Sequence, residues 1–189
     1  MRGSRLAAMG AFVVAALTLG ACASAASPPA RQASASAAPT ATDTAHLTDY
    51  AANTDGPKST VILTGAIGDY GRATSIHPDG TADPGHTSQL ELTLTRGTFR
   101  IIIGGLHAKL VNAFGQFPAN ARTCSGTVTA AAAAPIVAGS GTGAYTHVSG
   151  SFNLTATVDE VDTKPICDGS GAFRAQTIVI TGYGTVLPG

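Results

Sequence analysis

Residues 77–86, with the sequence HPDGTADPGH, bring together side chains that could bind a metal ion. Imidazole nitrogens and carboxylate oxygens are common zinc ligands, and here they belong to His77, Asp79, Asp83 and His86. The same segment holds two prolines and two glycines, which are typical of a turn at the protein surface. A polar surface loop is therefore the preferred interpretation, and no metal site is predicted here.

Two other groups of ionisable residues also have a simpler explanation than chemistry. Asp159, Glu160 and Asp162 have the oxygen atoms that calcium prefers, but a solvated loop beyond the end of a strand explains them better. His107 and Lys109 could act as a base and a cation in a pocket, whereas we expect their segment GGLHAKLVNAF to be a loop or a strand edge. Neither group is predicted to hold a metal or a cofactor.

The glycine-rich stretch VAGSGTGAYTHVSGSFNLTATV could hold a phosphate or could turn a sheet. Gly139, Gly141 and Ala144 fit the pattern G-x-G-x-x-A of dinucleotide-binding loops, which a helix must follow. Here an alternation of apolar and polar residues begins at Phe152 and predicts a strand instead. The glycines therefore predict a tight connection between two strands.

The sequence carries none of the common catalytic signatures. It has no G-x-S-x-G, no H-E-x-x-H and no Gly-Lys dipeptide of a phosphate-binding loop. Its 11 basic and 11 acidic residues balance, and no basic cluster is present that could bind nucleic acid. We therefore expect no cofactor and no nucleic-acid partner, and we favour a binding protein over an enzyme.

Residues 1–22 have the pattern of an export signal. Arg2 and Arg5 precede an apolar run of 14 residues, 6–19, which is shorter than the roughly 20 residues that span a membrane. The sequence LGAC that ends in Cys22 resembles the bacterial lipobox, which implies that Cys22 is lipidated. The alternative is cleavage by ordinary signal peptidase, with Cys22 discarded. The lipobox predicts an exported protein, anchored by its lipid to the outer face of the bacterial cytoplasmic membrane.

The chain has three cysteines, and lipidation of Cys22 would leave Cys124 and Cys167 as one pair. In an oxidising compartment we expect these two to form a disulfide. Closing the long loop between them would stabilise the fold by roughly 4 kcal/mol. The alternative is a pair of free, buried thiols.

Residues 23–57 consist mainly of Ala, Ser, Thr and Pro and lack any apolar periodicity. Such a segment cannot offset the entropy lost on ordering, so we predict a disordered tether, with at most a short helical turn at residues 46–52. No glycine occurs between Cys22 and Asp55, whereas glycines are frequent afterwards. The folded domain is therefore expected to occupy residues 58–189.

Apolar and polar residues alternate with a period of two through much of this domain. The alternation is clearest at Leu90, Leu92 and Leu94 and again from Phe152 onward. With the other β-rich segments, the expected total is about eight strands. The alanines at residues 130–134 are the one local helix former, and the run is too short for a stable helix. The domain is therefore predicted to be all-β.

Two motifs in this domain resemble those of plant allene oxide cyclases and dirigent proteins. The first is the stretch GDYG, formed by Gly68, Asp69, Tyr70 and Gly71. The second fits G-x-G-x-[FY]-x-x-[AV]-x-G, and its matching residues are Gly141, Gly143, Tyr145, Val148 and Gly150. The resemblance implies an eight-stranded antiparallel barrel of the allene oxide cyclase type, with a pocket at its mouth.

The resemblance implies less about activity. The cyclase pocket depends on a carboxylate and amide groups near the start of its barrel, and the segment STVILTGA at residues 59–66 carries neither. Dirigent proteins bind phenolic radicals and guide their coupling without oxidising them. We therefore carry over the barrel and leave the catalytic residues unassigned.

These observations predict a lipoprotein of the cell envelope whose barrel binds or shields a small apolar ligand or an envelope partner. Tyr70 and Tyr145 are the residues expected to contact a ligand, because each combines an apolar ring with a polar tip. One alternative is an isomerase or cyclase acting on an oxidised lipid or a phenolic compound. Another is a structural or adhesive surface module. An open cavity with Tyr and a few polar groups would favour binding, and a buried carboxylate of raised pKa beside that cavity would favour catalysis. A barrel interior packed with Phe, Ile and Leu would favour the structural or adhesive module.

Overall fold

The computed structural model describes residues 44–52, 58–83, 88–117, 120–170 and 172–188. The predicted signal, the lipobox cysteine Cys22 and most of the predicted tether lie outside these residues. The described chain forms eight strands, one α-helix and a short 3-10 turn. In chain order these are β1 (Thr44–Ala52), β2 (Lys58–Gly65), β3 (Asp69–Ile76), β4 (Gln89–Leu94), β5 (Gly97–Ile102), α1 (Gly104–Phe114), β6 (Ser125–Pro135), η1 (Gly143–Tyr145), β7 (Ser149–Asp162) and β8 (Phe173–Leu187).

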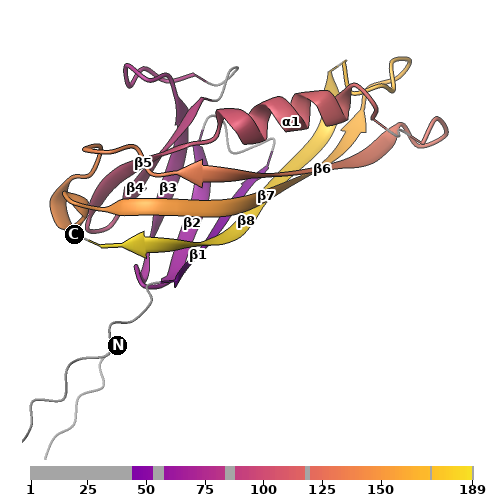
Figure 1. Cartoon of the computed structure of the whole chain (residues 1–189). Helices are drawn as coiled ribbons and strands as arrows, with labels where there is room; N and C mark the ends of the chain where they lie inside the picture. The colour runs from indigo at the N-terminus through magenta and orange to yellow at the C-terminus, as the bar shows by residue number, and fades with distance from the viewer. Residues whose placement is uncertain (1–43, 53–57, 84–87, 118–119, 171, 189) are drawn as a thin grey trace, which may run out of the picture. The chain divides into compact units, whose positions relative to one another are not determined.

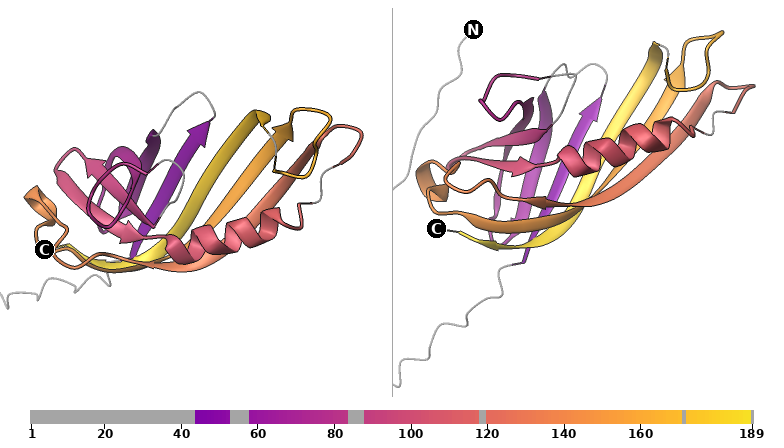
Figure 2. Two further views of the ribbon diagram at one scale, coloured as in Figure 1. Left: turned by 90° about the horizontal axis from the view of Figure 1, so that it is seen from above. Right: turned by 45° about the horizontal axis from the view of Figure 1, so that its top comes forward.

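All eight strands belong to one antiparallel sheet with the order β5-β4-β3-β2-β1-β8-β7-β6. Strands that follow one another in the chain are neighbours in the sheet, except β5 and β6, which form its two edges, and β1 and β8 join the two halves. The sheet curls into a half-barrel, as Figures 1 and 2 show. The prediction of an all-β, eight-stranded antiparallel domain is thus confirmed, but the barrel is open between its edge strands β5 and β6.

The predicted start of the domain at Lys58 is wrong, because residues 44–52 form strand β1 in the middle of the sheet. β1 pairs with β2 from Ala45 to Tyr50 and with β8 along its whole length. Its side chains alternate between the solvent and the interior, where Ala45 and Leu47 are fully buried. Hydrogen bonds on both edges therefore stabilise a segment whose composition resembles a tether, and the helical turn expected there does not form.

Residues 104–114 differ from expectation, whereas the alanine run in β6 forms no helix, in agreement with its short length. The alanine run at residues 130–134 lies inside β6, because β7 pairs with it from Ser125 to Pro135. The segment predicted to be a loop or a strand edge forms α1, which packs mainly against β6 and buries Leu106. In β6, pairing with β7 rather than local helix propensity decides the structure.

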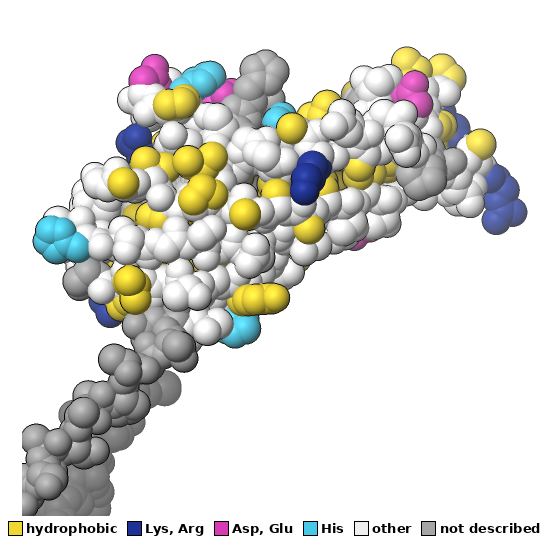
Figure 3. Space-filling model, in the orientation of Figure 1, with side chains coloured by type: hydrophobic (Ala, Val, Ile, Leu, Met, Phe, Trp, Pro, Cys, Tyr) yellow, Lys and Arg dark blue, Asp and Glu magenta, His cyan; other side chains and the backbone are white. Residues whose placement is uncertain are grey.

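The inner face of the curled sheet carries the hydrophobic core. Large side chains from both halves of the sheet are fully buried there: Leu47, Val61, Leu63, Leu92, Phe99, Ile101, Phe152, Leu154 and Val186. On the outer surface seen in Figure 3, hydrophobic side chains lie in scattered groups among polar ones, and charged side chains are sparse.

The glycine-rich connection between β6 and β7 closes one end of the half-barrel. Its backbone donates hydrogen bonds to the free edge of β5, from Val137 N to Arg100 O and from Thr142 N to Thr98 O, both at 2.9 Å. A single bridge between Ile101 and Ile136 continues this contact. The glycines thus connect two strands, as predicted, and we call this part, with the β2–β3 and β4–β5 turns beside it, the closed end.

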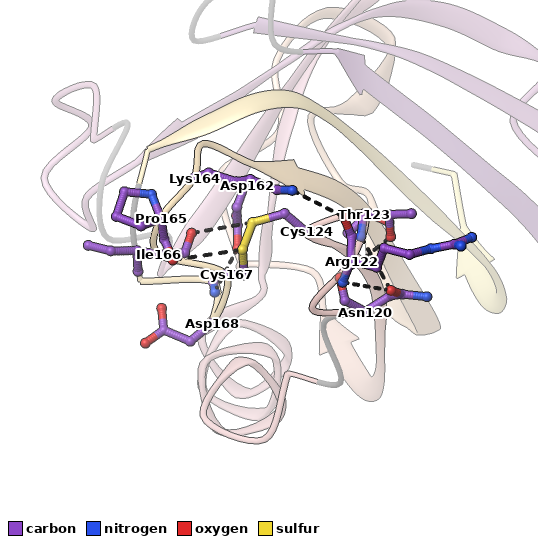
Figure 4. The surroundings of a disulfide bond; sticks show 12 residues. Asn120, Arg122, Thr123, Cys124, Asp162, Lys164, Pro165, Ile166, Cys167 and Asp168 are labelled. Carbon is purple, nitrogen blue, oxygen red and sulfur yellow. Dashed lines mark hydrogen bonds between the residues drawn. A yellow bond between two sulfur atoms is a disulfide. The ribbon is translucent and has the colours of Figure 1, made fainter.

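Cys124 and Cys167 form a disulfide with their Cα atoms 4.9 Å apart, as the sequence predicts. Cys124 directly precedes β6, and Cys167 lies between β7 and β8. Figure 4 shows a second link in this region, where Lys164 Nζ donates a hydrogen bond to Arg122 O at 3.2 Å. The disulfide therefore links the start of β6 to the connection between β7 and β8, at the end of the sheet opposite the closed end.

Candidate ligand-binding site

A cavity of about 580 Å³ lies between α1 and the inner face of the sheet. This volume is typical of small-molecule sites. It lies at the end of the sheet where β1 and β3 end and β2 begins, which we call the open end. Its apolar lining comes from six elements or their flanks, and the residues are Ala51, Ala52, Ala73, Leu90, Ile103, Leu106, Leu110, Phe173, Ile178 and Ile180. Its polar lining residues are Asp49, Lys58, Ser59, Ser75, His107 and Gln176.

Asp49 is the buried carboxylate of this cavity. Its side chain lies on the inner face of β1 and the residue is only 4% exposed. The residues paired with it on the neighbouring strands are the apolar Val61 and Ile180. Within the described structure, Asp49 Oδ1 has no hydrogen-bond partner and Asp49 forms no ion pair. The cavity wall therefore presents an unsatisfied acceptor.

Burial raises the pKa of Asp49 to about 6, although hydrogen bonds from the Ser59 hydroxyl and the Tyr50 backbone partly oppose the shift. A carboxyl group with this pKa is mostly ionised at neutral pH and mostly protonated at about pH 5. The cavity thus holds a group that changes charge close to neutrality. Such groups are frequent in binding and catalytic sites.

The structure separates His107 from Lys109, which the sequence pairs as a base and a cation. His107 lies on α1, half-buried, and lines the cavity. Lys109 instead donates a hydrogen bond to Ala131 O at 2.7 Å, at the edge of β6. It therefore covers a strand edge and takes no part in the cavity lining.

Neither tyrosine expected to contact a ligand lines this cavity. Tyr70 lies on the outer face of β3 and is 65% exposed. Tyr145 is buried in the core, where its ring meets Phe99 edge to face at 5.4 Å between ring centroids. Strand alternation explains why Tyr70 faces the solvent, because its neighbour Asp69 faces inward.

The two motifs that carry the family resemblance meet at the closed end. The Tyr145 hydroxyl donates a hydrogen bond to Asp69 Oδ2 at 2.5 Å. Asp69 also accepts hydrogen bonds from the Thr95 hydroxyl at 2.5 Å and from the backbone N–H groups of Tyr70, Thr95 and Arg96. Burial alone would raise the pKa of Asp69, but these donors outweigh it and hold the pKa well below its usual range. Asp69 therefore has hydrogen-bond donors for both of its oxygens and holds the turns of the closed end together.

The same contact shifts the pKa of Tyr145 upward, opposite to the shift of Asp69. Burial, followed by the hydrogen bond to Asp69, raises the pKa of Tyr145 to about 12. The phenol consequently stays protonated and acts as a hydrogen-bond donor throughout the physiological range. This pair joins the β2–β3 turn to the glycine connection.

The glycines of the second motif allow the backbone to pack closely enough for the contact between Tyr145 and Asp69. A β-carbon at Gly141 would collide with the carbonyl oxygen of Tyr145, and one at Gly143 would collide with that of Arg96. Gly143 also has a φ of +58°, which larger residues rarely adopt. Both glycines are thus needed for packing at the closed end.

The remaining candidate ligands for metals do not gather into a site. His77 Nδ1 lies 3.2 Å from Asp83 Oδ2, and Asp79 accepts hydrogen bonds from the Thr81 hydroxyl and N–H. His86 lies outside the described residues. The described part of the chain contains no group of three or more His, Cys, Asp or Glu side chains that could hold a metal ion.

The acidic segment at residues 159–162 is part of β7, so the expectation of a solvated loop is wrong. Asp159 faces outward and accepts a hydrogen bond from the Thr127 hydroxyl, whereas Glu160 and Asp162 face inward and are buried. Burial raises the pKa of Glu160, the Asp162 carboxyl adds to the rise, and the Gln176 amide opposes it. Gln176 donates to Glu160 Oε2 at 2.5 Å and places this acid next to the cavity lining.

No family model, curated protein or solved structure matches this chain. The resemblance to allene oxide cyclases and dirigent proteins therefore stays a prediction. Among the residues that the structure describes, no helix has the length and the apolar character that crossing a membrane requires.

Sequence reasoning missed Asp49, because it assigned residues 44–52 to the tether. One signal could have revealed it. Ala45, Leu47 and Ala51 alternate with polar residues as in a half-buried strand, and Asp49 occupies a position on their face. An acid in an apolar row of this kind indicates a buried carboxylate.

Proposed function

We propose that this protein binds a small, mainly apolar molecule in the cavity beneath α1 and releases it unchanged. The observation that carries this proposal is the cavity itself, whose mostly apolar wall contains a buried carboxylate with an unpartnered oxygen. Ligand sites commonly combine an apolar wall with a few polar groups that orient the ligand. A cavity of this size also favours binding over a purely structural or adhesive module.

Dye binding tests this proposal. The neutral apolar dye Nile red should bind the purified protein saturably, with one dye per chain. Ala51→Phe, which fills the cavity from β1, should weaken binding by about tenfold or more. Thr48→Phe places the same side chain on the outer face of the same strand and should leave binding unchanged. Absence of saturable binding, or equal binding by the two variants, would contradict the proposal.

Asp49 also favours a second candidate function, an isomerase or cyclase that acts on an oxidised lipid or a phenolic compound. A carboxyl group whose pKa is raised to about 6 can serve as a general acid or base near neutral pH. The resemblance to allene oxide cyclases supports this candidate, because strand β1 now supplies the carboxylate that residues 59–66 lack.

Recovery of the bound molecule separates the two functions. Binding alone predicts that an unsaturated epoxide or a phenolic compound is recovered unchanged after incubation. An isomerase would convert it into a product of equal mass, and Asp49→Asn would abolish the conversion while the molecule still binds.

We further propose that the protein is a lipoprotein of the cell envelope, held by lipidated Cys22 on the outer face of the cytoplasmic membrane. The lipobox-like LGAC and the disulfide, which is typical of oxidising compartments, support this location. Labelling of cells with a radioactive fatty acid should tag the protein. Cys22→Ser should remove the tag, and a variant that keeps it would contradict the proposal.

A further inference from the structure

We propose that the cavity selects ligands that carry a protonated amine at one end of an apolar body, and that this ammonium group binds the carboxylate of Asp49. The inference rests on the proposed binding function and adds the chemical class of the ligand.

Among the residues that the structure describes, Asp49 has neither a counter-ion nor a full set of hydrogen bonds. Its cross-strand neighbours are apolar, Oδ1 has no partner, and it forms no ion pair within the described chain. An ionised carboxylate in such a place is unfavourable unless a donor or a cation reaches it. An ammonium group supplies a positive charge and up to three N–H donors, whereas a hydroxyl group supplies one donor and no charge.

The positions of the other charged groups around the cavity also favour a positively charged ligand group at Asp49. Lys58, at the first residue of β2, is exposed to solvent, where water screens its charge. His107 is half-buried on α1, and buried Glu160 lies behind Gln176. Acidic groups thus lie inside, and the lysine lies at the solvent-facing edge. An amine that enters with its apolar body against the lining meets a carboxylate at the wall.

Competition against Nile red with decylamine, decanol and decanoate tests the inference, because the three share one apolar chain and differ in the end group. At neutral pH we expect decylamine to compete about tenfold more strongly than decanol, with decanoate the weakest. Asp49→Asn should remove the preference for the amine and change decanol binding by less than about twofold. Asp159→Asn makes the same change on the outer face of β7 and should keep the preference.

The pH dependence gives a second measurement on the native protein, which is needed if Asp49→Asn does not fold. Since the pKa of Asp49 is raised to about 6, the preference for the amine should shrink between about pH 7.5 and about pH 5. Circular dichroism checks that each variant is folded.

The outcomes distinguish the two proposals. Equal competition by amine and alcohol would overturn the inference and leave the binding function standing. A preference for decanoate would also overturn it and would point to Lys58 as the anchor. Absence of Nile red binding to the native protein would overturn both.

Discussion

Asp69 and Asp49 are both buried carboxylates on the inner side of one sheet, but the fold supplies hydrogen-bond donors fully to only one of them. Asp69, at the closed end, accepts hydrogen bonds from two hydroxyl groups and three backbone N–H groups. Asp49, at the open end, has an oxygen beside the cavity, Oδ1, that finds no hydrogen-bond partner among the described residues. Their pKa values shift in opposite directions as a result. The comparison indicates that a satisfied buried acid holds the fold together, whereas an unsatisfied one is available to a ligand.

We expect the largest effect from substitutions at the glycines of the closed end. Replacing Gly141 and Gly143 together by valine should remove the native fold, a loss of more than about 4 kcal/mol, because both β-carbons would collide with backbone carbonyl oxygens. Circular dichroism and urea unfolding report the loss.

Gly105→Val is the matched control at the open end, since a β-carbon there meets no atom within 4 Å. This variant should stay folded. A normal β-sheet spectrum from the Gly141 and Gly143 double variant would mean that the closed end tolerates rearrangement.

Removing the carboxylate of Asp69 should cost about 3–5 kcal/mol at neutral pH, because Asp69→Ala takes the acceptor away from the buried Tyr145 hydroxyl and from the part-buried Thr95 hydroxyl. The pKa of Asp69 is lower in the folded than in the unfolded state, so its stabilisation is full above the ordinary aspartate pKa of about 3.9. That stabilisation is lost as the pH falls below this value.

Urea unfolding at about pH 7 and about pH 3 should therefore show a smaller difference between native protein and Asp69→Ala at the lower pH. A constant difference across this range would argue that the carboxylate charge contributes nothing at the closed end.

Asp49→Asn should have the opposite effect and stabilise the protein by about 3 kcal/mol at about pH 8. The pKa of Asp49 is raised to about 6 in the folded state, above the unfolded value of about 3.9. The native protein is therefore most stable, with respect to this group, below the unfolded value and loses stability as the pH rises through about 6. Asparagine does not ionise, so the variant escapes this loss.

Chemical unfolding of both proteins at about pH 4 and about pH 8 measures the effect. Parallel stability profiles for native protein and Asp49→Asn would show that the site does not penalise the charged form of Asp49.

The smallest effect concerns the two motif tyrosines. Tyr145→Phe removes the hydroxyl that donates to Asp69 and should cost about 1–2 kcal/mol. Tyr70→Phe makes the same change at an exposed ring and should cost less than about 0.5 kcal/mol. Thermal unfolding of the pair shows whether the contact with Asp69 accounts for the difference, and equal losses would contradict that role.

Local patterns were sufficient where a segment's own side chains alternate. The alternation at Leu90, Leu92 and Leu94 predicts β4, and the run from Phe152 predicts β7. The turn glycines were also predictable, since positive φ and close backbone approach limit which residue fits. The cysteine pair followed from counting.

Local patterns failed where a distant partner decides the conformation. The segment GGLHAKLVNAF, expected to be a loop or a strand edge, forms α1, which packs mainly against β6. Residues 44–52 look like a tether, yet β8 at the far end of the chain pairs with them. Hydrogen bonds to another strand outweigh the small differences in intrinsic propensity.

The sequence by itself determined an all-β domain with glycine connections and a cysteine pair, because these depend on side-chain period, backbone freedom and residue count. Only the tertiary structure decided where the buried acids lie. Asp69 and Tyr145 are far apart in the chain and meet because the glycine connection returns to β5. Asp49 faces a cavity because β1 lies between β2 and β8 and α1 covers the open end. Burial and pairing depend on these long-range contacts, which no local pattern contains.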